Sequence, residues 1–223
     1  MLETLIAEQH TEYDLLICAG RVFCPVNGID GPGVVTLRGD RIVVAGPNVT
    51  GRAWETLEFP DGLLLPGLVD LHAHPGSGNS KYGIHPDVHL LTRGVTTVLS
   101  QGDAGAANWE RYRKEIIEAS LTRVLLAINL AAPGESKPHG CCEDLEDVDV
   151  DAYIRAIEAC RNGIWGVSVN TSVMTCGKTD PDEVLSRGLA VAEATGLLIL
   201  FGSRRHPDRS LPAQLERLRA GDV

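Results

Sequence analysis

The sequence predicts an α/β protein in which a small β-rich N-terminal part precedes a longer part of alternating strands and helices. From Tyr13 to about Glu58, short apolar runs alternate with turn residues and show no helical periodicity. From residue 63 onward, apolar runs alternate with amphipathic stretches of helical length. That order is typical of parallel strands joined by right-handed helical crossovers.

The N-terminal part is predicted to hold five short strands, at residues 15–18, 21–24, 33–37, 41–45 and 53–58. Each interval between them contains good turn residues. These separators are Ala19-Gly20, Asn27-Gly28, Gly39-Asp40 and Gly46-Pro47-Asn48.

The longer part begins with a strand whose side chains suggest chemistry. Residues 63–76 read Leu-Leu-Leu-Pro-Gly-Leu-Val-Asp-Leu-His-Ala-His-Pro-Gly. Side chains alternate faces along a strand, so Asp70, His72 and His74 are expected to point the same way. Two imidazoles on one strand face can bind one metal ion.

Four further strands are predicted after this one, at residues 94–100, 123–130, 164–170 and 197–201. Between and after them, Asn108 is expected to cap one helix and Gly163 to end the next. Asp180-Pro181 starts a third, which Gly196 ends, and residues 211–219 form a last helix.

Charge and composition exclude several classes of partner. The chain has 223 residues and a net charge of −10, so a nucleic-acid or anionic-membrane partner is not expected. Its six cysteines form no Cys-x-x-Cys pair, which favours reduced thiols in a cytoplasmic protein. The N-terminus lacks the features of a signal peptide, and no apolar run approaches membrane-spanning length.

The chain resembles the amidohydrolase superfamily, and within it the dihydroorotase-like amidohydrolase and deacetylase branch. The resemblance rests on the N-terminal β meander, on Pro66-Gly67-Leu-Val-Asp70-Leu-His72-Ala-His74, and on Gly94-Val-Thr-Thr-Val98. It implies a (β/α)₈ barrel of TIM type with a β-sandwich built from both chain ends. It also implies one or two divalent metals, often zinc, which activate a water that attacks an amide or related bond.

On this resemblance, residues 1–62 are the N-terminal part of the β-sandwich and residues 63–223 an incomplete barrel with about five of eight strands. His72 and His74 would be metal ligands from the first strand, and Asp70 a neighbour that supports them. The fourth strand has Ser168 where the family has a bridging lysine, and Asn170 follows two residues later. The fifth strand lacks the family's histidine, although His206 follows on a loop.

Other polar residues are further candidates for the site. Asp103, after the second barrel strand, could bind metal or position a substrate, or could be a turn residue beside Gly102. The histidines 85 and 89 are expected to form a polar surface, Cys141-Cys142 a pair of loop thiols, and Arg204-Arg205 a solvated loop. No catalytic base is identified.

Two functions remain open from the sequence. In the first, the chain is a zinc-dependent hydrolase of C–N bonds in a small-molecule substrate, or the C-terminally incomplete copy of one. In the second, it is a non-catalytic scaffold of the same fold that has lost most ligands. An unclosed barrel exposes strand edges, so a homo-oligomer that covers them is expected.

Overall fold

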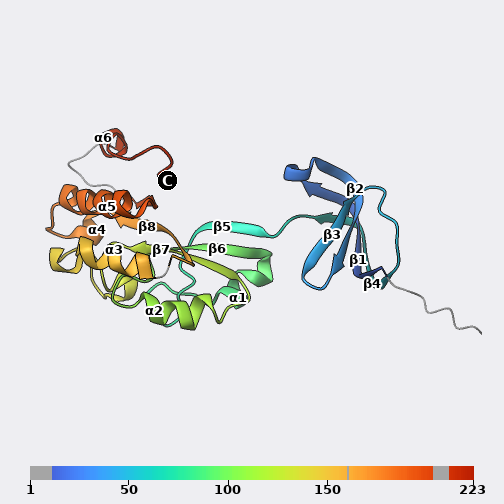
Figure 1. Cartoon of the computed structure of the whole chain (residues 1–223), viewed down its shortest axis with the longest axis horizontal. Helices are drawn as coiled ribbons and strands as arrows, with labels where there is room; N and C mark the ends of the chain where they lie inside the picture. The colour runs from blue at the N-terminus through green and yellow to red at the C-terminus, as the bar shows by residue number, and fades with distance from the viewer. Residues whose placement is uncertain (1–11, 160, 203–210) are drawn as a thin grey trace, which may run out of the picture. The chain divides into compact units, whose positions relative to one another are not determined.

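The computed structural model describes residues 12–159, 161–202 and 211–223. The chain forms two compact units, which meet in the sequence between Pro66 and Gly67. Figure 1 shows the N-terminal unit in blue to teal and the second unit from cyan through green to red. Within the described residues, no helix combines the length and the apolar character that crossing a lipid bilayer requires.

The N-terminal unit is a four-stranded sheet in the order β3-β2-β1-β4. Its strands are β1 (Tyr13–Cys24), β2 (Ile29–Arg38), β3 (Arg41–Gly46) and β4 (Ala53–Leu64), with a short 3₁₀ turn η1 (Pro25–Asn27) after β1. β1 pairs antiparallel with β2 and parallel with β4, and β2 pairs antiparallel with β3. Ala19, Val22 and Val35 form its small buried core.

One predicted turn in this unit is wrong. Residues 15–18 and 21–24 belong to the single strand β1, which continues through Ala19-Gly20 with an irregular register. A Cβ on Gly20 would lie 1.9 Å from the carbonyl oxygen of Pro60. Glycine is therefore needed here for the close approach of two strands, which the sequence alone does not distinguish from a turn.

The second unit contains a parallel sheet of five strands in sequential order, as predicted. These are β5 (Leu68–Ala73), β6 (Val95–Gln101), β7 (Arg123–Asn129), β8 (Ile164–Asn170) and β9 (Leu198–Gly202). Sequential parallel strands with intervening helices are the arrangement of a (β/α) barrel, of which five strands are present here. The fold is thus a small β domain followed by a partial barrel of TIM type.

The connections of the second unit carry short helical turns and two longer helices. The longer ones are α3 (Val150–Ala159) and α5 (Pro181–Thr195). The others are α1 (Pro86–His89), η2 (Leu91–Arg93), α2 (Trp109–Tyr112), η3 (Arg113–Ile117), η4 (Gly134–Ser136), η5 (Leu145–Asp147), α4 (Val173–Cys176) and α6 (Leu211–Leu215).

The helix boundaries follow the predicted signals only in part. Asp180 caps α5 through a hydrogen bond from the backbone N–H of Asp182, with Pro181 in the first turn. Asn108 was expected to cap its helix, but its side chain accepts from Gly105 N and donates to the carbonyl of Pro133. It therefore ties two loops together, a role that depends on a loop far along the sequence.

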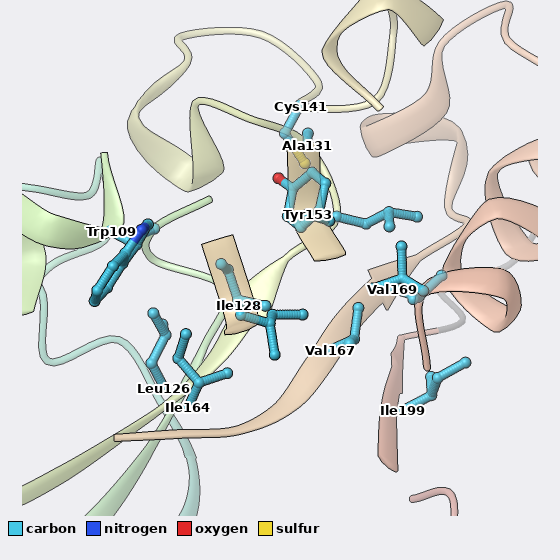
Figure 2. Close-up of a cluster of buried hydrophobic side chains, with 14 of the residues drawn as sticks. Trp109, Leu126, Ile128, Ala131, Cys141, Tyr153, Ile164, Val167, Val169 and Ile199 are labelled. Atoms are coloured by element: carbon cyan, nitrogen blue, oxygen red, sulfur yellow. The ribbon is translucent and has the colours of Figure 1, made fainter. Parts of the chain in front are cut away.

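The main core lies between the sheet and its helices. In Figure 2, Ile128 of β7 lies between Tyr153 of α3 and the neighbouring pair Leu126 and Ile164, and Val167 and Val169 of β8 lie on the side of Ile199. Gly188 of α5 lets this helix approach β8, because a Cβ there would lie 2.6 Å from a methyl of Val169. This packing fixes the strands whose carboxyl ends form the site described below.

The C-terminal end of α5 gives a conformational prediction. Gly196 has a φ of 69° and no heavy atom within 4 Å of the place of a Cβ, so only backbone strain opposes a side chain. We expect Gly196→Ala to lower the free energy of unfolding by about 1 kcal/mol, the usual cost of the left-handed region. Denaturant titration measures this. Gly196→Asn should lose less, and an equal loss would contradict the explanation.

The residues at the end of the described chain attach to β9. Val223 exchanges backbone hydrogen bonds with Ile199 and Phe201, of 2.9 and 2.7 Å. The carboxylate of Asp222 accepts from Ile199 N and from the backbone and guanidinium of Arg219. Burial opposes its charge, but the hydrogen bonds from Arg219 and Ile199 outweigh this and hold the pKa of Asp222 below its ordinary value.

A pH dependence follows from this contact. Because the folded pKa is lowered, the stabilisation is full above the unfolded pKa of about 3.9 and is lost as pH falls through the folded value. We expect wild type to melt above Asp222→Asn near neutral pH, and the difference to shrink in acid. Thermal melts over a pH series measure this; a pH-independent difference would refute it.

Candidate active site

A cavity of about 780 Å³ opens at the carboxyl ends of the parallel strands. In barrels of this type, this end of the sheet carries the functional residues. Residues from four strands contribute to its lining, among them His72, Gln101, Ser168, Asn170 and Gly202.

His72 and His74 both line this cavity. Their ring centroids are 6.3 Å apart and their planes meet at 75°. His72 lies in β5 and His74 immediately follows it. The structure therefore brings the two candidate ligands to the same opening.

Asp70 is arranged differently. It is not among the residues that line the cavity, and its carboxylate accepts a hydrogen bond of 2.9 Å from the backbone N–H of His72. The pairing of β5 with β6 is irregular between Asp70 and Ala73, so the strict alternation assumed from the sequence does not hold. Its support of His72 is through the backbone, and any contribution to metal binding stays a prediction.

Asp103 meets His74 beneath the cavity. Asp103 Oδ1 lies 2.8 Å from His74 Nδ1, and the carboxylate is fully buried. Its other oxygen accepts hydrogen bonds from Ser100 Oγ at 2.9 Å and from the hydroxyl of Tyr112 at 3.2 Å. Burial, and then the charge of Asp103, raise the pKa of Tyr112 well above its ordinary value, so Tyr112 keeps the proton that it donates.

Ser168 and Asn170 line the cavity from β8. The side chain of Asn170 accepts a hydrogen bond of 2.9 Å from Ser172 N. A Cβ on Gly102 would lie 2.9 Å from the Ser168 hydroxyl, which shows how closely the end of β6 approaches β8. The β8 side of the cavity thus presents neutral hydroxyl and amide groups, and no negatively charged group that could bridge two cations.

The loops add groups that the sequence pattern did not single out. Lys81 Nζ lies 3.4 Å from Glu135 Oε2 and donates to the backbone oxygen of His139. The ring of Tyr82 lies 5.4 Å from that of His74. Lys81, Tyr82, Glu135 and His139 all line the cavity, but no sequence motif marks them because they lie in the connections between strands.

The loop thiols have different surroundings. Cys141 reaches the cavity wall, with its Sγ 4.0 Å from that of Cys142. The contact with Cys142 holds the pKa of Cys141 below its ordinary value, whereas the same contact and burial raise that of Cys142. Burial raises the pKa of Cys176 to about 12.

The remaining candidates lie away from the cavity or beyond the described residues. His85 precedes α1 and His89 ends it, and both are exposed and do not line the cavity. His206 and Arg204-Arg205 lie outside the described residues.

The donor groups present fit part of a zinc site. Zinc in proteins normally takes three or four protein ligands, mostly imidazole, thiolate or carboxylate. The part of the chain that the structure describes brings no three His, Cys, Asp or Glu side chains together in a way that would hold a metal. His72 and His74 therefore supply at most two ligands and need others to complete a site.

Comparisons with known proteins agree with this fold. No family model matches the chain. It is 32% identical over 172 residues to a deacetylase of Brucella anthropi and 29% identical over 172 residues to a deacetylase of Agrobacterium fabrum. Each match covers 76% of this chain and 42% of the relative. The chain thus spans about two fifths of the length of these curated relatives.

Solved structures show the same partial coverage. An adenine deaminase superposes with a TM-score of 0.82 at 23% identity, over 95% of this chain and 55% of its own. A dihydroorotase gives 0.82 at 25% identity, over 93% and 55%. An N-acyl-D-glutamate deacylase from Bordetella bronchiseptica, complexed with zinc and a phosphonate inhibitor, gives 0.58 at 17% identity, over 85% and 44%.

Proposed function

We propose, on the premise that the chain belongs to the amidohydrolase superfamily, that it is the N-terminal part of a metal-dependent hydrolase of C–N bonds. The observation that carries the proposal is the placement of His72 and His74 at one opening, with a buried carboxylate behind His74. A histidine whose second nitrogen is bonded to a carboxylate is the usual form of a metal ligand.

In this proposal His72 and His74 hold a divalent ion, with zinc expected. Its chemistry would be to lower the pKa of a water and to polarise the carbonyl that the water attacks. The other ligands and the catalytic base would come from groups outside the described residues. We expect the missing ligands and the base in sequence that would complete the barrel, because the relatives are more than twice as long as the part that matches this chain.

The substrate class that we propose is a small N-acyl compound or cyclic amide. Support comes from the relatives, which are named deacetylases and a dihydroorotase, and from the size of the cavity. Neutral polar groups of Gln101, Ser168 and Asn170, and the Lys81–Glu135 pair at the wall, would contact the substrate. A reducing cytoplasmic setting fits the five cysteines that the described residues contain as free thiols.

The test is metal content and hydrolysis. The chain, together with whatever coding sequence follows Val223, is purified with added zinc and assayed by metal analysis. It is then tested against a panel of N-acetyl and N-formyl amino acids and cyclic amides. Stoichiometric zinc with turnover of a panel member supports the proposal, and a metal-free, inactive protein overturns it.

The incomplete ligand set favours one second candidate, a non-catalytic scaffold of the same fold. In this case the open edges of the five-stranded sheet would be covered by a second copy. Sedimentation or light scattering of the 223-residue chain separates the candidates. A stable monomer with a sharp thermal transition argues against the scaffold, and a zinc-free oligomer argues for it.

A further inference from the structure

We propose that Asp103 is a positioning residue, which fixes the tautomer and the orientation of His74 so that its Nε2 serves the cavity. The proposal concerns a contact between two loops that are 29 residues apart. It rests on the proposed function only in assuming that Nε2 of His74 binds a metal ion.

The hydrogen bond between Asp103 and His74 determines which ring nitrogen carries the proton. A neutral imidazole has one nitrogen that donates and one that accepts. Asp103 Oδ1, at 2.8 Å, is an acceptor and therefore places the proton on His74 Nδ1. Nε2 is then the accepting nitrogen, which is the form that can coordinate a cation.

Two buried hydrogen-bond donors hold the carboxylate of Asp103. A carboxylate buried to this extent is costly unless its oxygens receive hydrogen bonds. Ser100 and Tyr112 donate to Oδ2, while Oδ1 faces His74. Ser100 and Tyr112 are themselves fully buried, so the carboxylate has a fixed direction.

Asp103 is not placed to be a direct metal ligand, a role that the sequence left open. Both of its oxygens are occupied by hydrogen-bond donors, its exposed fraction is 0%, and it does not line the cavity. A cation in the cavity would have to reach it through His74. Asp103 is thus placed to act on His74 and not on substrate.

The surrounding backbone is built around this contact. A Cβ on Gly76 would lie 2.9 Å from Cγ of Asp103, and a Cβ on Gly83 would lie 2.1 Å from the carbonyl oxygen of Gly76. Glycine at both positions lets the loop after β5 close over the carboxylate. Tyr82, from the same loop, adds a ring contact to His74.

The test uses Asp103→Asn in the 223-residue chain, labelled with ¹⁵N. Long-range ¹H–¹⁵N spectra of the zinc-free protein report the tautomer of His74, and competition with a chromogenic chelator reports zinc affinity. We expect the wild-type ring to carry its proton on Nδ1 and the variant to shift toward Nε2. We expect zinc binding to weaken by about 10–100-fold, the usual effect of removing such a partner.

Asp87→Asn is the matched control. Asp87 also accepts several hydrogen bonds, from the backbone of Leu121 and from the backbone and hydroxyl of Thr122, but the histidine whose charge acts on it is His85 and not His74. It should leave the His74 spectrum and zinc binding unchanged. Tyr112→Phe keeps the carboxylate and removes one supporting donor, so it should give a smaller effect if Asp103→Asn does not fold.

The outcomes separate this inference from the proposed function. A wild-type His74 ring that carries its proton on Nε2, or a His74 spectrum that is unchanged in a folded Asp103→Asn, overturns the inference, whatever the zinc affinity. A shifted spectrum with weakened zinc binding supports both. A shifted spectrum in a chain that binds no zinc in any form keeps the positioning by Asp103 and counts against the metal-dependent function.

Discussion

Replacing His72 or His74 by alanine is expected to remove zinc binding and hydrolysis together. Each change deletes one of the two imidazoles that the structure brings to the cavity, in a site that has no third described ligand nearby. Removal of a direct ligand should weaken zinc affinity by more than the factor of about 10–100 that follows removal of a residue that supports a ligand. Metal analysis after dialysis, and the amide panel described above, measure both effects.

The control for these variants is His89→Ala. His89 is exposed at the end of α1 and does not line the cavity, so its removal takes away an imidazole without touching the site. Zinc content and activity should match those of wild type. If His72→Ala or His74→Ala keeps its zinc, or if His89→Ala loses it, the assignment of the ligands is wrong.

The second large effect concerns the core that holds the strand ends in place. Ile128 of β7 is fully buried, and Figure 2 shows it between Tyr153 of α3 and the strand residues Leu126 and Ile164. Truncation to alanine removes three carbons and leaves a cavity, so we expect Ile128→Ala to lower the free energy of unfolding by about 2–5 kcal/mol. Denaturant titration followed by circular dichroism gives this value.

Leu121→Ala is the control for the core variant. The Leu121 side chain is 84% exposed, and it precedes the same strand. Surface substitutions usually change stability by no more than about 0.5 kcal/mol. A loss of similar size in both variants would mean that unfolding does not report the packing of this core.

Part of the structure could be predicted because it depends on patterns within short stretches of the sequence. The alternation of apolar runs with amphipathic stretches predicted five parallel strands, and all five are present in order. Asp180 with Pro181 predicted the start of α5. Side-chain alternation along a strand predicted that His72 and His74 point the same way, and both line the cavity, while their role as metal ligands stays a prediction.

Other predictions failed or stayed open where distant segments meet. Gly20 resembled a turn residue, but it serves the approach of β1 to Pro60. Asn108 resembled a cap, but it joins two loops. Asp103 could be read as a ligand, a substrate contact or a turn residue, because no local pattern states which partner a loop side chain meets.

The sequence by itself therefore determined the fold class, the family resemblance and the pair of histidines, since periodicity and short motifs record local burial and direction. Only the tertiary structure decided that Asp103 lies behind His74 and that Ser100 and Tyr112 hold it there. The physical reason is that strand pairing and helix packing set the distances between loops. Hydrogen bonds of about 3 Å depend on those distances.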